Sequence, residues 1–90
     1  MSSNLRFNDR RDHNEREIIE ALESVGCSVQ KLRDGPDLLV GRMNTNYLLE
    51  VKNGNRGLNA KQAEWHAAWR GQKAVVRNIK EALAAVGIPS

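Results

Sequence analysis

The chain has 90 residues, which is enough for one small domain with a single modest hydrophobic core. Its 14 lysines and arginines exceed its 11 aspartates and glutamates, and this mild basic bias is compatible with a polyanionic partner. The single cysteine excludes a disulfide framework and a cysteine-based zinc site, and no apolar run is long enough for a membrane span or a signal peptide. The protein is therefore expected to be intracellular, with no membrane partner.

Residues 1–8 are polar without an apolar period and are expected to form a flexible arm, followed by one domain over residues 9–90. The pattern then predicts a helix, three strands, a helix, a strand and a short helix, over about 12–25, 28–32, 37–41, 46–52, 59–70, 73–78 and 79–86. A crossover helix between the third and fourth strands makes them parallel, so the predicted α/β fold has a mixed four-stranded sheet flanked by helices.

The first helix carries an acid within its apolar stripe, which consists of Ile18, Ile19, Leu22 and Val25. Glu15 lies one turn before this stripe, at its centre, whereas Glu17 and Glu20 project away from it. A carboxylate on a core-facing stripe is costly to bury unless a metal ion or a polar network compensates it. The alternative is that Glu15 faces solvent at the edge of the core and interacts favourably with the helix dipole.

Charged residues stand where two apolar strands begin and end. Asp37 follows Gly35-Pro36 at the start of one strand, and Glu50-Val51-Lys52 closes the next. Because side chains alternate along a strand, Glu50 and Lys52 point the same way, and hairpin pairing brings Asp37 beside Glu50. Neighbouring carboxylates repel each other unless a cation lies between them. Asp37, Glu50 and the Val51 carbonyl are therefore predicted to bind Mg²⁺ or Mn²⁺, with waters completing its shell.

Such an ion would polarise a phosphodiester and lower the pKa of a bound water, while Lys52 orients the water or stabilises charge at phosphorus. Glu15 would hold a metal-bound water or a second ion. The expected reaction is in-line hydrolysis, since no serine or cysteine is suitably placed to act as a covalent nucleophile. The alternative is structural: Asp37 closes a turn, and Glu50 and Lys52 form a surface ion pair of little energetic value.

These residues resemble a known family. The chain is similar to the PD-(D/E)xK nuclease superfamily in its segment from Asp12 to Ile19, its helix end at Gly26, its Gly35-Pro36-Asp37 turn and its Glu50-Val51-Lys52 motif. Within that superfamily it resembles archaeal Holliday-junction resolvases and small phage-type VRR-NUC nucleases, over roughly residues 14–76. The resemblance implies a restriction-endonuclease-like core and a bacterial or phage-encoded DNA endonuclease that depends on Mg²⁺ or Mn²⁺.

The resemblance also implies roles for individual residues. Glu15 matches the helix acid, Asp37 and Glu50 the metal ligands, and Lys52 the catalytic lysine of the family. Similar nucleases place a glutamine near the site at the start of the second helix, which gives Gln62 a contact with metal-bound water or phosphate. A capping box formed with the preceding Asn59 explains Gln62 equally well, and the two roles are compatible. Resolvases of this type act as homodimers on branched DNA, and the likeness implies the same partners here.

Basic residues are scattered along the chain, as on an ordinary solvated surface. The best candidates for phosphate contacts are Arg6, Arg10, Arg11, Lys31, Arg33, Arg56 and Lys61. No base-reading motif is present, so structure-specific binding is favoured over sequence-specific binding. Trp65 and Trp69 share a helix face with His66 and are expected to fill a core or a dimer interface. Two other functions remain open: a non-catalytic nucleic-acid-binding protein with the nuclease fold, and a scaffold whose tryptophan helix docks a partner.

Overall fold

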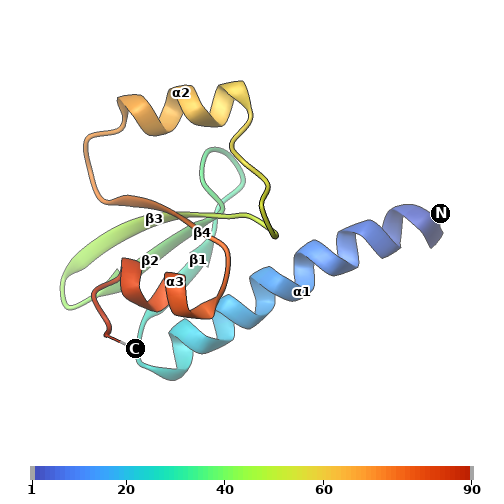
Figure 1. Ribbon diagram of the computed structural model, residues 1–90. Helices are drawn as coiled ribbons and strands as arrows, with labels where there is room; N and C mark the ends of the chain where they lie inside the picture. The colour runs from blue at the N-terminus through green and yellow to red at the C-terminus, as the bar shows by residue number, and fades with distance from the viewer. Residues whose placement is uncertain (1, 90) are drawn as a thin grey trace.

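The fold is described from a computed structural model that gives the backbone of residues 2–89 and the side chains of residues 13–89. Its elements are α1 (Ser2–Ser24), β1 (Ser28–Lys31), β2 (Leu38–Arg42), β3 (Thr45–Val51), α2 (Ala60–Ala68), β4 (Lys73–Val76) and α3 (Ile79–Ala85) (Figure 1). The predicted element order and the α/β class are confirmed.

The four strands lie in the sheet in chain order, β1-β2-β3-β4. Antiparallel pairing joins β1 to β2 and β2 to β3, whereas β4 runs parallel to β3 because α2 carries the chain back across the sheet. This confirms the mixed sheet. The β2–β3 hairpin is tighter than its predicted four-residue connection: only Met43 and Asn44 lie between the strands, both with positive φ, as a type I′ turn requires.

Helices cover the two faces of the sheet unequally. In Figure 1, α1 and α3 lie on one face and α2 stands over the other. The buried apolar core occupies the α1 and α3 face and consists of Ile18, Leu22, Cys27, Leu38, Val40, Leu49, Val76, Ala82 and Val86. Each fully buried large aliphatic side chain contributes about 1.5–3 kcal/mol, so this single layer carries most of the hydrophobic stabilisation. In contrast, α2 contains no buried residue.

Helix α1 begins earlier than the sequence predicted. It starts at Ser2 rather than near Asp12, because nothing between these positions breaks a helix once its first turn has formed. Figure 1 shows this added part extending away from the sheet, and the flexibility expected of residues 1–8 stays a prediction.

The other end of α1 agrees with the sequence, since Gly26 takes a φ of +95° just after it. The placement of Val25 on the apolar stripe was wrong: the helix ends at Ser24, and Val25 is 48% exposed in the following turn. Within the described residues, no helix combines the length and the apolar character needed to cross a membrane.

Candidate active site

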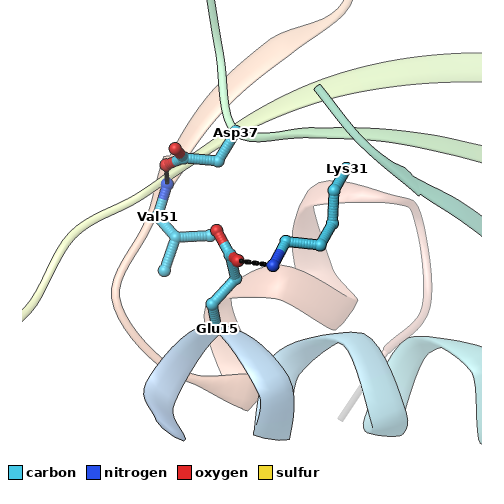
Figure 2. A network of polar contacts seen from close by, with 4 residues as sticks. All are labelled: Glu15, Lys31, Asp37 and Val51. Carbon is cyan, nitrogen blue, oxygen red and sulfur yellow. Dashed lines mark hydrogen bonds and ion pairs between the residues drawn. The ribbon is translucent and has the colours of Figure 1, made fainter. Parts of the chain in front are cut away.

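The β2–β3 register brings Asp37 to the end of β3. Leu38 lies opposite Leu49, so one step beyond the ladder places Asp37 against Glu50. Asp37 Oδ2 accepts a hydrogen bond of 2.7 Å from the Val51 amide (Figure 2). Because the N–H and C=O of a strand residue point to the same side, the Val51 carbonyl also faces the side where Asp37 lies. The strand end therefore offers two oxygen atoms that could ligate a metal ion, one from the Asp37 carboxylate and one from the Val51 carbonyl.

Glu50 points to the opposite face of the sheet from Leu49, toward α2. Its side chain is buried, with only 4% exposure, which rules out the surface ion pair that the sequence had left open. Gln62 Nε2 donates to Glu50 Oε2 over 3.3 Å, and Lys52 Nζ donates to Gln62 Oε1 over 2.8 Å. Gln62 therefore links the carboxylate and the ammonium that the sequence placed on one face.

The same glutamine starts α2. Asn59 Oδ1 accepts from the Gln62 amide at 2.8 Å, and Gln62 Oε1 accepts from the Asn59 amide at 3.0 Å, which completes the predicted capping box. The capping-box explanation is therefore confirmed, and the same Gln62 oxygen also accepts from Lys52. A contact of Gln62 with metal-bound water or phosphate stays a prediction. At its other end α2 stops at Ala68, two residues short of the predicted Arg70, because Trp69 is extended.

Glu15 reaches the strand end from the other side. It lies on α1, its side chain is only 17% exposed, and its Oε1 is 3.1 Å from Lys31 Nζ (Figure 2). The compensating charge for this carboxylate is therefore a lysine of β1. Glu15 and Glu50 approach from opposite faces of the sheet. Accordingly, residues 13–89 contain no group of three or more His, Cys, Asp or Glu side chains that could hold a metal ion together.

The donors present nevertheless suit magnesium. Mg²⁺ prefers oxygen ligands, keeps several waters, and is commonly held by one or two carboxylates rather than by a complete protein cage. Asp37 and Val51 offer a carboxylate and a carbonyl on one side of β3, and the buried carboxylate of Glu50 lies next to them in the register. Glu50 accepts from Gln62 Nε2 and adds a second carboxylate at this strand end.

An open cleft of about 850 Å³ borders Glu50. One wall is the loop Arg33–Pro36, and the other is the face of α2 that bears Gln62, Trp65 and His66. Trp65 stacks on Trp69 with ring centroids 5.0 Å apart and planes 14° apart. Trp69 is 44% exposed and Trp65 only half-buried, so they do not fill the core of this chain, and the alternative of a dimer interface stays a prediction. A helix without buried residues leaves its tryptophans at the surface.

His66 has an unusual environment. Burial, and then the nearby Lys73 ammonium, lower the pKa of His66 below its ordinary value. Its Nε2 is shut off from solvent and has no hydrogen-bond partner among the described side chains. Lys73 Nζ donates to the carbonyls of His66 and Trp69, the latter over 2.8 Å, and so holds the C-terminal end of α2.

The predicted phosphate contacts are dispersed. Arg33 and Lys61 are exposed and line the cleft. Arg56 is exposed in the loop before α2, where its carbonyl accepts from Arg77 Nη2 over 3.1 Å. Three further candidates, Arg6, Arg10 and Arg11, lie on the projecting part of α1, and their side chains fall outside the described residues.

Sequence reasoning missed the pairing of Lys31 with Glu15 and the cleft itself. A signal for the first was present, because Lys31 lies opposite Leu38 on β2 and shares the sheet face that α1 covers. The cleft had no such signal, since it depends on the height at which α2 stands over the sheet.

Comparison with known proteins supports a nuclease-like fold. A solved structure described as a "VRR_NUC domain" superposes with a TM-score of 0.71 and 27% sequence identity, covering 84% of this chain and 92% of that one. This likeness suggests a nuclease. Neither a protein-family model nor a curated protein matches the chain.

Proposed function

We propose that this protein is a divalent-metal-dependent endonuclease that hydrolyses DNA phosphodiester bonds. The main observation behind this proposal is a set of hydrogen bonds at the end of β3. Asp37 accepts from the Val51 amide, and Gln62 joins the Glu50 carboxylate to the Lys52 ammonium. The set lies in a fold similar to a VRR_NUC domain. Its residue types, two carboxylates, a main-chain carbonyl and a lysine, suit metal-assisted hydrolysis of a phosphodiester.

Each residue has a distinct part in this proposal. Asp37, Glu50 and the Val51 carbonyl hold the Mg²⁺ or Mn²⁺ ion, which when bound polarises the phosphodiester and lowers the pKa of water. Lys52 presents its ammonium to the phosphate and offsets negative charge that develops there. Gln62 fixes the position of Lys52 through the 2.8 Å bond.

Glu15 completes the residue assignment from the α1 side. Its partner Lys31 neutralises it in the free protein, so Glu15 orders water beside the ion rather than ligating the ion that Glu50 holds. A role in ordering water does not require Glu15 and Glu50 to bind the same ion.

The proposed substrate is branched or otherwise structured DNA, bound by a homodimer, as in the Holliday-junction resolvases that the sequence resembles. The absence of a base-reading motif from the sequence supports structure-specific binding. The exposed cations Arg33, Arg56 and Lys61 are assigned to phosphate contacts, with Arg10 and Arg11 on α1. The salt dependence of DNA binding and light scattering test these contacts and the homodimer.

Cleavage of a panel of labelled DNAs tests the activity. Four-way junction, gapped duplex, intact duplex and single strand are incubated with Mg²⁺, with Mn²⁺ and with EDTA. We expect metal-dependent products that vanish in Glu50→Gln, while a charge-matched control in exposed α1, Glu23→Gln, cleaves like the natural protein. Retained DNA binding without cleavage in either metal would instead establish the non-catalytic nucleic-acid-binding protein. Cleavage by Glu50→Gln at the natural rate would locate the reaction elsewhere.

A further inference from the structure

We propose that the cleft between the Arg33–Pro36 loop and α2 is a binding site for one unpaired nucleobase of the DNA, stacked on Trp65. The inference rests on the proposed function and specifies its substrate class: DNA with an unpaired nucleotide beside the phosphate that is cut. The cleft volume of about 850 Å³ falls in the range of about 300–1,000 Å³ that small organic ligands occupy.

The aromatic wall is the first reason. Trp69 stacks on Trp65 with planes only 14° apart, so one face of the Trp65 indole is taken. Trp65 also lines the cleft, whereas Trp69 does not contribute to its lining. An indole backed by a second ring and bordering an open cleft is the kind of platform on which proteins stack unpaired bases.

Charge decides which part of a nucleotide enters. Three carboxylates line the cleft, those of Asp34, Glu50 and Glu64, against two cations, Arg33 and Lys61. In the metal-free protein a phosphate inside would meet this excess of negative charge, whereas a neutral base would not. Carboxylates also accept hydrogen bonds from the N–H groups of bases, among them the N3–H of thymine. The base therefore occupies the interior, and its phosphates remain near the two exposed cations.

His66 lies beside the platform and also lines the cleft. Its ring meets Trp65 with centroids 5.0 Å apart and planes 75° apart. Its Nε2 has no hydrogen-bond partner within residues 13–89 but is shut off from solvent, so this nitrogen is out of reach of a base in the cleft. The lowered pKa of His66 favours the neutral ring, which adds no positive charge to the cleft lining.

The position relative to Glu50 connects the cleft to the reaction. Glu50 and Gln62 line the cleft and also belong to the proposed catalytic set. A base stacked on Trp65 therefore has its sugar and phosphate next to the end of β3. Fully paired DNA keeps its bases stacked inside the duplex, so it leaves the cleft empty.

Tryptophan fluorescence tests this site without cleavage. The chain has two tryptophans, so Trp69→Phe leaves Trp65 as the only indole, and Trp65→Phe leaves Trp69. Each variant is titrated with octathymidylate in EDTA. We expect saturable quenching of Trp65 emission and little change in Trp69 emission. Unchanged Trp65 emission at saturating oligonucleotide overturns the inference.

Affinity measurements add a matched pair. Trp65→Leu is expected to bind octathymidylate about 5- to 100-fold more weakly, because base–aromatic stacking is lost, while affinity for an intact duplex changes less than about 2-fold. Met43→Ala removes an exposed apolar side chain in the β2–β3 turn, outside the cleft lining, and serves as the control. Equal losses in both variants, or a loss for duplex as large as for single strand, contradict a base site at Trp65.

The two proposals fail separately. If the natural protein cleaves DNA with Mg²⁺ but Trp65 does not respond to oligonucleotide, the base site is wrong and the nuclease stands. If Trp65 is quenched but no DNA is cleaved in either metal, the base site stands and the nuclease is wrong.

Discussion

Replacing Asp37 separates the structural role of its carboxylate from its chemical role. Asp37→Asn keeps an oxygen that can accept from the Val51 amide over the present 2.7 Å, but it removes the charge. A hydrogen bond to a charged group contributes about 1.5–3 kcal/mol and a neutral one about 0.5–1.5 kcal/mol, so Asn should cost about 1 kcal/mol of unfolding free energy. Asp37→Ala leaves the Val51 amide without this acceptor and should cost about 2–3 kcal/mol.

The catalytic consequence follows a different order. Both variants remove the negatively charged oxygen that would ligate the ion. Loss of a residue that only hydrogen-bonds to a metal ligand lowers activity by up to about 100-fold, so loss of a ligand itself should lower the cleavage rate by at least about 100-fold. Urea unfolding in EDTA gives the stabilities, and cleavage in Mg²⁺ of the DNA that the natural protein cuts fastest in the panel gives the rates. The charge-matched Glu23→Gln should alter neither. Full cleavage by Asp37→Asn, or equal stability of the Asn and Ala variants, refutes the reasoning.

Three further outcomes are expected. Asn59→Ala removes one half of the capping box, which stabilises the helix by about 1 kcal/mol. In hydrogen exchange followed by mass spectrometry, the amides of α2 should therefore exchange about 5-fold faster, while those of β3 stay unchanged. Burial raises the pKa of the Cys27 thiol, against a smaller lowering by Arg42, so a disulfide reagent at pH 8 should modify Cys27 only as fast as the chain unfolds. Burial lowers the pKa of His66 in the folded chain, so the unfolded chain binds a proton at a higher pH than the folded chain does. The free energy of unfolding should therefore fall as the pH drops through about 6.5, the ordinary pKa of histidine. Urea unfolding at a series of pH values should show a weaker pH dependence in His66→Gln.

The fold could be read largely from local patterns. Apolar alternation located the strands, and the capping box at Asn59 and Gln62 located the start of α2 within one residue. The crossover through α2 fixed the parallel pairing of β3 and β4. These features depend on residues close in sequence or on general rules of chain connection, so a single sequence contains them.

The site was harder because it depends on distance across the sheet. Period-two alternation and hairpin pairing were enough to place Asp37 and Glu50 at the same strand end, one step beyond the register pair of Leu38 and Leu49. They were insufficient for Glu15, since the face from which α1 approaches depends on packing between elements distant in sequence. For the same reason the sequence left open whether Trp65 and Trp69 fill a core or an interface: helix periodicity gives a shared face but not what covers it.

The chain-order arrangement of the strands has a consequence for folding. The β2–β3 turn closes over two residues, so hairpin contacts form between neighbours in sequence at small entropic cost. The β3–β4 pairing must wait until the whole of α2 has been carried across. We therefore expect Asp37 to meet the Val51 amide with the early hairpin. Gln62 is close to Lys52 in sequence and needs no β4 for its contact, so both contacts of the site precede the addition of β4 to the sheet.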